Sequence, residues 1–244
     1  MSKTIRSTFL ILLFFAIWQA VIVVFRLPSY ILPSPLQVIC SFINYRQLIM
    51  MQTLPTLLEM LAGLSFSILL GTGLAFMMCS FRMVYSLLRP LLLISQTLPI
   101  FAIAPLLVIW FGYGTVTKVT TITLMLFFPI TSNFLDGLKQ TPQAYLDSAR
   151  LMGGNRWQVL YHIRAPAALP HLASGIRLAT AMAPLAAVIS EWIGANQGLG
   201  FLLLRSNAQM QIDLMFATLW VLILLSLFMY YFIGKLSYFT TPWL

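Results

Sequence analysis

Long apolar stretches dominate this chain and leave few architectures open to it. Six of them are long enough to cross roughly 30 Å of hydrocarbon, which takes about 20 mostly apolar residues in a helix. They lie at residues 8–25, 53–78, 91–111, 119–138, 169–190 and 214–234. Only 8% of the 244 residues are charged and 60% are hydrophobic, too few charges to coat a water-soluble globule. The sequence therefore predicts an all-α integral membrane protein with six transmembrane helices in one domain over 1–244. It excludes a soluble enzyme, a nucleic-acid-binding domain and a disordered chain.

The distribution of positive charge predicts the orientation of these spans, because Lys and Arg gather in cytoplasmic segments. With the N-terminus inside, nine such residues lie in cytoplasmic segments: Lys3, Arg6, Arg82, Arg89, Lys139, Arg150, Arg156, Arg164 and Lys235. Four lie outside: Arg26, Arg46, Lys118 and Arg205. This bias accounts for the net charge of +9 without a nucleic acid partner, and it places both termini in the cytoplasm. Arg177 falls inside the fifth span, so we expect it to snorkel or to face protein.

The second and fifth spans carry small residues at four-residue spacing, which places them on one helix face. The ladders are Gly63, Ser67, Gly71 and Ala75 in the second span, and Gly175, Ala179, Ala183 and Ala187 in the fifth. Small residues let helices approach closely within a membrane. The pattern favours static helix packing over an interface that slides during transport.

The longest polar segment, residues 139–168, connects the fourth and fifth spans on the cytoplasmic side. A structureless loop of this length is uncommon, and its punctuation predicts two short helices. The first is expected to begin at Thr141-Pro142, run to Met152 and stop at Gly153-Gly154. The second is expected to begin with Asn155 as cap and Gln158 in a capping-box variant, and to end before Pro166. Exposed apolar residues on such a helix-turn-helix indicate a docking site for a partner protein.

The same loop resembles a known family motif. Asp147-Ser148-Ala149 is followed after three residues by Gly153, after nine more by Ile163, and after one more by Ala165-Pro166. This spacing is that of the "EAA" loop in the inner-membrane permeases of binding-protein-dependent ABC importers. That family has Glu-Ala-Ala, Gly, Ile and Leu-Pro at these positions, so this chain departs by Asp147 for Glu, Ser148 for Ala and Ala165 for Leu.

The resemblance extends over essentially the whole chain. The segments Leu32–Pro35, Pro105–Gly112, Glu191–Ala195 and Gly198–Gly200 look like the nitrate, sulfonate and taurine branch of the family. The stretch Asn207–Ala217 looks most like permeases for the pyrimidine precursor of thiamine. The resemblance implies the type I ABC importer permease fold in a bacterial inner membrane, acting as a homodimer. It also implies two separate ATP-binding subunits and an extracytoplasmic binding protein, which often determines the substrate. Sulfonate, taurine or nitrate import is the alternative.

The chain itself offers no catalytic chemistry that its sequence can identify. It has no Gly-x-x-x-x-Gly-Lys-Ser/Thr loop for ATP phosphates, and neither His162 nor His171 has a carboxylate or thiolate at metal-ligand spacing. We therefore expect no enzyme activity, no metal and no cofactor in this chain, with ATP and Mg²⁺ bound by the partner. A stand-alone channel or secondary transporter is the alternative class, disfavoured because the spans lack paired carboxylates or a basic relay. An integral-membrane enzyme is disfavoured because no catalytic groups converge.

Two sets of residues are the candidate functional positions. The resemblance implies that the first set couples the permease to the ATPase: Asp147, Ser148, Ala149, Arg150, Gly153, Ile163 and Pro166. The second set consists of polar residues in or beside spans, which could line the translocation pathway or its gate: Gln96, Thr97, Asn133, Ser190 and Glu191. Glu59 is a further polar group within a span.

Overall fold

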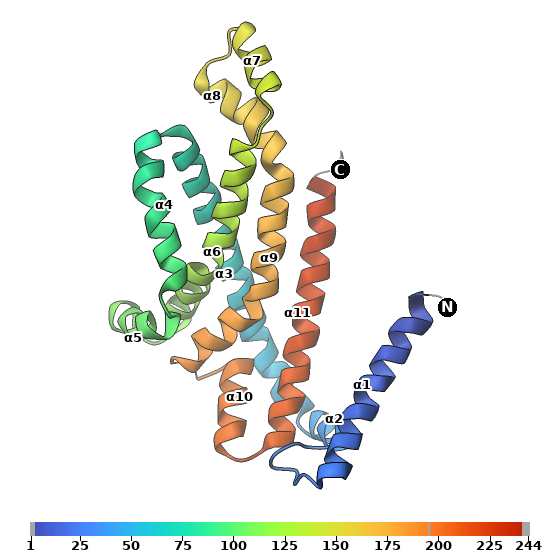
Figure 1. Ribbon diagram of the computed structural model, residues 1–244. Helices are drawn as coiled ribbons and strands as arrows, with labels where there is room; N and C mark the ends of the chain where they lie inside the picture. The colour runs from blue at the N-terminus through green and yellow to red at the C-terminus, as the bar shows by residue number, and fades with distance from the viewer. Residues whose placement is uncertain (1–2, 195, 241–244) are drawn as a thin grey trace. The chain divides into compact units, whose positions relative to one another are not determined.

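The computed structural model describes residues 3–194 and 196–240, and in this part of the chain every regular element is helical. The elements are α1 (Lys3–Phe25), α2 (Pro35–Asn44), α3 (Arg46–Ser80), α4 (Arg82–Thr97), α5 (Ile100–Phe111), α6 (Thr115–Lys139), α7 (Gln143–Leu151), α8 (Arg156–Val159), the π-helical turn η1 (Leu160–Arg164), α9 (Ala165–Trp192), α10 (Leu199–Ala208) and α11 (Ile212–Thr240) (Figure 1). Ala195, the last residue of the Glu191–Ala195 motif, lies outside the described residues. The predicted all-α class is confirmed.

Four stretches in the described residues are long and apolar enough to cross a membrane: Arg46–Ser80, Thr115–Lys139, Arg156–Trp192 and Ile212–Leu236. The pair α4 and α5 passes the same test only when its two helices are taken together. In α1, the described apolar stretch Leu12–Phe25 is shorter.

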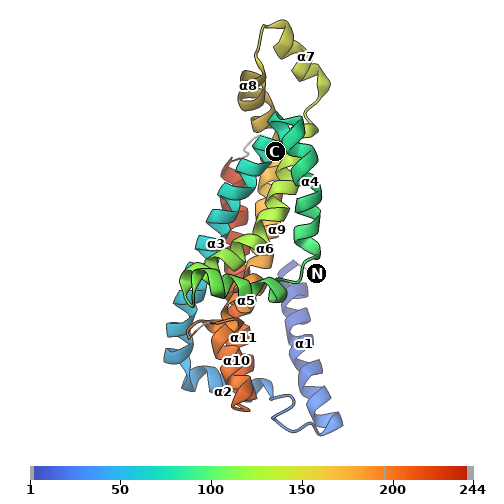
Figure 2. The ribbon, with the colours of Figure 1, turned by 90° about the vertical axis from the view of Figure 1, so that its left-hand side faces the viewer.

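The third expected span, 91–111, is wrong as a single straight helix. Its two halves, α4 and α5, meet at an angle of 103° (Figure 2). Leu98 between them is extended, with ψ of 122°, and Pro99 follows it. Proline disfavours the helical conformation of the residue before it and has no N–H to donate, so the helix ends here. This segment is a broken span or a re-entrant pair.

The chain divides into two compact units. One contains the residues up to Thr56 with Asn196–Leu224, and the other contains residues 57–194 with the part from Leu225 onward. α3 and α11 contribute residues to both units.

The larger unit is built on α6 and α9, which lie side by side in both views (Figures 1 and 2). Its apolar core joins α3, α6, α9 and α11 through Met60, Ile122, Ile130, Ala183 and Met229. Both small-residue ladders face α6. A Cβ atom on Gly63 would collide with Ile122, and one on Gly175 would lie 3.0 Å from the Pro129 carbonyl oxygen. The ladders therefore let α3 and α9 approach α6 closely, as the packing interpretation expects.

A second core of this unit holds the end of the bundle from which α7 and α8 project. Phe134 and Leu138 of α6 pack there with Met78 of α3, Leu160 of η1 and Ala168 of α9. The Phe76 ring meets Phe134 edge-on at 5.1 Å. The helix-turn-helix is therefore anchored to the ends of three spans.

The smaller unit contains two short helices, α2 and α10, that the apolar pattern does not predict. Ser34 and Gln37 form a reciprocal capping box at the start of α2. The first N–H groups of α10 are satisfied from α3: Gly198 N donates to Gln52 Oε1 at 2.6 Å, and Leu199 N donates to Thr56 Oγ1 at 2.8 Å. Such caps stabilise helix ends that have no intrahelical partner.

Candidate functional site: a helix-turn-helix and a buried charge cluster

The polar segment between α6 and α9 folds as the predicted helix-turn-helix, at one end of the larger unit (Figure 1). Gly153 has φ of +79°, the left-handed conformation expected of a residue that ends a helix. Asn155 and Gln158 form both hydrogen bonds of the predicted capping box, each 2.8 Å long. The local sequence therefore determines both the end of α7 and the start of α8.

Two boundaries of the segment differ from expectation. α7 begins at Gln143, and Pro142 rather than Thr141 occupies its cap position, while the Thr141 hydroxyl donates to the Leu138 carbonyl oxygen. The second helix does not end before Pro166 but continues through η1 into α9. In η1, Ala165 N donates to the carbonyl oxygen of Leu160, five residues back. A π-turn changes the hydrogen-bond register, and Pro166 then falls in the first turn of α9, where its missing N–H is tolerated.

The predicted coupling residues lie along this helix-turn-helix with different exposure. Asp147, Ser148, Arg150, Gly153 and Pro166 are exposed, Ile163 is half-buried and Ala149 is buried. Asp147 Oδ1 accepts hydrogen bonds from Gln143 at 3.0 Å and from Arg150 at 3.4 Å. Leu151 and Met152, at the tip of the turn, are 90% and 88% exposed. Exposed apolar side chains of this size agree with the docking site that the sequence predicts, and that role stays a prediction.

The predicted pathway residues do not come together in one place. Gln96 and Thr97 are exposed at the end of α4, and the Thr97 hydroxyl donates to the Ile94 carbonyl oxygen at 2.9 Å. Asn133 is half-buried on α6 and donates to the Pro129 carbonyl oxygen at 2.7 Å. Ser190 and Glu191 are 2% and 1% exposed near the end of α9. The role of all five residues in the translocation pathway or its gate stays a prediction.

Sequence reasoning missed a buried charge cluster at the end of the larger unit opposite the helix-turn-helix. The sequence predicts Lys118 in an outer segment, and the structure shows in addition that it is buried, 3% exposed, in the first turn of α6. Its Nζ atom lies 2.6 Å from Oε1 of Glu59 on α3. Glu191 of α9 lies close enough to Glu59 to interact with its carboxyl group. A charged side chain inside an apolar span is expected to pair with an opposite charge. The presence of Glu59 within the second span is therefore the sequence feature that could have predicted a buried partner such as Lys118.

Arg177 of α9 is directed toward protein, as expected. Its Nη2 atom donates to the Gly234 carbonyl oxygen of α11 at 3.3 Å. Across residues 3–194 and 196–240, no group of three or more His, Cys, Asp and Glu side chains is arranged to hold a metal ion.

Comparison with known proteins places these features in context. The sequence pattern described as "Binding-protein-dependent transport system inner membrane component" matches residues 63–237. A probable ABC transporter permease protein of Haemophilus influenzae is 44% identical over 220 residues, covering 90% of each chain. The formylaminopyrimidine transport permease protein ThiX of Halalkalibacterium halodurans is 36% identical over 242 residues, covering 99% of this chain and 96% of the relative. A structure of the MetNI methionine ABC transporter in an inward-facing conformation aligns with a TM-score of 0.71 at 16% identity, over 81% of this chain and 98% of the matched chain.

Proposed function

Because this chain belongs to the family of binding-protein-dependent transport system inner membrane components, we propose that two copies of it form the translocation pathway of a bacterial ABC importer. The chain is a multi-pass permease subunit with the type I importer fold. In the proposal, two ATP-binding subunits dock on the helix-turn-helix from the cytoplasm and hold the ATP and Mg²⁺. A binding protein delivers the substrate from the other side of the membrane.

The observation that carries the coupling role is helical continuity. α8, η1 and α9 form one apolar stretch of 37 residues, Arg156–Trp192. At 1.5 Å per residue this stretch is about 55 Å long, enough to reach across a bilayer. A displacement of the docked turn is therefore passed directly into the span that packs on α6. α7, with Asp147, Arg150 and its apolar tip, presents the contacts for the ATP-binding subunit.

The far end of the same stretch supports a gate role for Ser190 and Glu191. Glu191 lies beside the carboxyl group of Glu59, which is paired with Lys118, so ionisable side chains of α3, α6 and α9 meet there. Buried charges tolerate few arrangements, since an unpaired one is costly. A shift of α9 would therefore move this cluster between discrete states rather than gradually. We assign the gate to this end of the larger unit.

The proposed substrate is a small pyrimidine precursor of thiamine, with taurine, alkanesulfonates and nitrate as the alternative. The support is the similarity to the formylaminopyrimidine permease over nearly the whole chain. Charge points the same way. An anionic cargo is helped by positive charge at its entrance. Lys118, one of four cations expected on the outer side, is instead buried and neutralised by Glu59. A neutral heterocycle needs no such field.

The test is uptake by proteoliposomes that contain the permease with its own ATP-binding subunit and binding protein. We expect ATP-dependent, saturable uptake of labelled formylaminopyrimidine or its amino form, and none without ATP. Taurine and nitrate serve as parallel cargoes under the same conditions. Uptake of taurine or nitrate without uptake of the pyrimidine would reverse the substrate assignment. Uptake that persists without the ATP-binding subunit would contradict the importer mechanism itself.

A further inference from the structure

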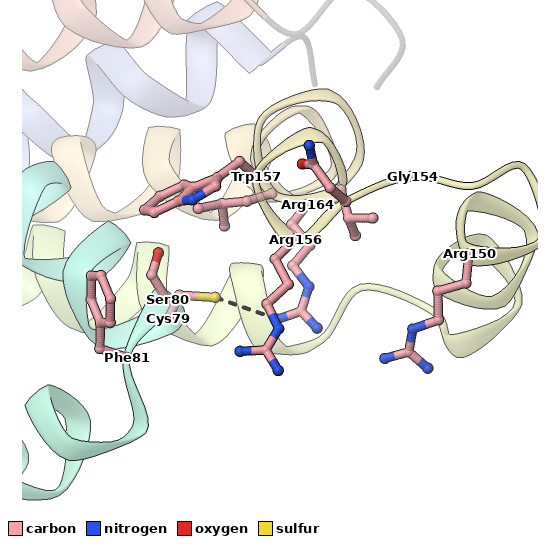
Figure 3. A pocket seen from close by; sticks show the side chains of 11 residues that line it. Cys79, Ser80, Phe81, Arg150, Gly154, Arg156, Trp157 and Arg164 are labelled. Carbon is pink, nitrogen blue, oxygen red and sulfur yellow. Dashed lines mark hydrogen bonds between the residues drawn. The ribbon is translucent and has the colours of Figure 1, made fainter.

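A large cavity lies between the turn from α3 to α4 and the turn from α8 into η1, within the larger unit (Figure 3). Its volume is about 820 Å³, within the range of about 300–1,000 Å³ typical of small-molecule sites. Eleven residues line it: Cys79, Ser80, Phe81, Arg150, Gly154, Asn155, Arg156, Trp157, Val159, Leu160 and Arg164. The family's coupling motif accounts for Arg150 alone among its three arginines.

The charge of this lining is positive and poorly compensated. Arg150, Arg156 and Arg164 contribute three guanidinium groups, and no acidic residue is among the lining residues. Arg164 is half-buried, and its Nη1 atom donates to the Cys79 sulfur at 3.4 Å, a weak acceptor. Among the described residues the Arg156 guanidinium has no hydrogen-bond or ion-pair partner. Within the described part of the chain, the one ion pair of Arg150 is its long, exposed contact with Asp147. Like charges facing one space repel unless an anion lies between them.

Figure 3 shows how these groups are directed. The guanidinium groups of Arg156 and Arg164 extend from the α8–η1 turn into the space beside Cys79, and Arg150 reaches toward that space from α7. Three guanidinium groups, on α7, α8 and η1, are therefore directed toward one space. A guanidinium offers a planar fork of N–H groups that matches the oxygens of a phosphate.

Another part of the lining is aromatic and lies at the level where spans end. Phe81 meets Trp157 edge-on at 6.2 Å, and Trp157 stacks on Tyr161 at 6.2 Å. Cys79 and Ser80 end the span α3, and Arg164 directly precedes α9. If α3 and α9 span a bilayer, we expect this level to lie near the headgroups, the region that aromatic side chains favour. A wall of rings beside a cluster of guanidinium groups suits an amphiphile that has an anionic head.

We propose that this cavity binds the phosphate headgroup of an anionic phospholipid from the leaflet on the side of the helix-turn-helix. Arg156 and Arg164 hold the phosphate oxygens, and the rings of Phe81 and Trp157 lie against the glycerol and the first acyl carbons. Basic pockets between spans on the cytoplasmic side are a recurrent form of headgroup recognition. The apolar tip of Leu151 and Met152 stays free for protein docking. Lipid binding of this kind would link the membrane to the coupling element, and it does not depend on which cargo is carried.

The experiment uses the full-length chain purified in a mild detergent and followed by native mass spectrometry. Phosphatidylglycerol, phosphatidylcholine of matched acyl chains and inorganic phosphate are titrated separately. We expect one phosphatidylglycerol to be retained per chain in preference to phosphatidylcholine. Arg156→Gln and Arg164→Gln should each weaken retention about fivefold, and the double variant about 25-fold, since a basic residue near an anionic surface contributes about that factor. Arg89→Gln is the matched control, because it removes the same charge from α4 outside the cavity and should leave retention unchanged.

Several outcomes would overturn the proposal. Phosphatidylcholine carries the same phosphate group but is neutral overall. Equal retention of the two lipids would therefore show that the cavity does not select a headgroup with net negative charge. Displacement of the lipid by millimolar inorganic phosphate would assign the cavity to a free anion. Unchanged retention in the double variant, with loss of a co-purifying ATP-binding subunit, would assign the arginines to that protein. Because lipid retention is measured without transport, its failure leaves the importer function standing, and a failed uptake assay leaves this site standing.

Discussion

The ion pair between Lys118 and Glu59 places opposite charges 2.6 Å apart where the two side chains are only 4% and 3% exposed. Burying either charge without the other costs several kcal/mol of desolvation free energy, so each group is stable in this position only because the other is present. Glu191 adds a second carboxyl group to the cluster. The three residues come from α3, α6 and α9, so their arrangement depends on how those helices meet.

Removal of the lysine should therefore destabilise the permease strongly. Lys118→Met leaves two buried carboxyl groups without a counter-charge, and we expect the free energy of unfolding to fall by about 3–5 kcal/mol. Unfolding can be followed by titrating the purified protein from mild detergent into dodecyl sulfate. Lys235→Met, which removes an exposed lysine from α11, is the control and should change stability by less than about 0.5 kcal/mol.

A double variant makes this prediction sharper. If Lys118 and Glu59 are coupled, Glu59→Gln combined with Lys118→Met should cost less than the sum of the two single changes, by at least about 1 kcal/mol. Strict additivity would show that the two groups do not stabilise each other, and would remove the basis for a charged gate at this end of α9.

At the scale of elements, the sequence predicts best where local chemistry decides the backbone. Gly153 adopts the expected left-handed conformation, and Asn155 with Gln158 forms the expected box, because both depend on a few adjacent residues. Pro99 is also a local signal for the end of a helix. The apolar pattern does not contain this signal, so it predicts residues 91–111 as one span. The burial of Lys118 is not predicted, because it depends on pairing with Glu59, 59 residues away in the chain. Long-range pairing of this kind is not visible in a periodicity.

The turn between α7 and α8 allows a direct test of the coupling element. Gly153 has φ of +79° and open space around its Cα, so a side chain there is opposed only by the backbone conformation. Gly153→Val should cost on the order of 1–2 kcal/mol locally, because a β-branched residue avoids this region. We expect the protein to insert normally but to retain less of its ATP-binding subunit on co-purification, with lower uptake.

The conservative partner of that variant is Gly153→Asn, since asparagine enters the left-handed region more readily than other residues. Its co-purification should be close to that of the unchanged chain. If valine at this position supports normal assembly and transport, the turn is not needed for docking, and the coupling role of the loop is contradicted.

The whole molecule adds a constraint that no single helix carries, because the side of the membrane on which the helix-turn-helix lies decides what can dock there. The charge bias predicts that this segment and both termini lie in the cytoplasm, and the prediction is the same when the buried Lys118 is left out of the outer count. The α4–α5 pair leads from the end of α3, which packs beside the end of α6, to the start of α6, so it counts as one crossing.

Single cysteines in a background of Cys40→Ser and Cys79→Ser test this orientation. Thr115→Cys, exposed at the start of α6, and His162→Cys, exposed on η1, flank the span formed by α6. We expect a membrane-impermeant maleimide added to intact cells to label position 115 alone, and position 162 to react only after the membrane is opened. Labelling of both positions from the same side would contradict a membrane-spanning α6. Labelling of 162 alone in intact cells would invert the molecule and place the docking tip out of reach of any ATP-binding subunit.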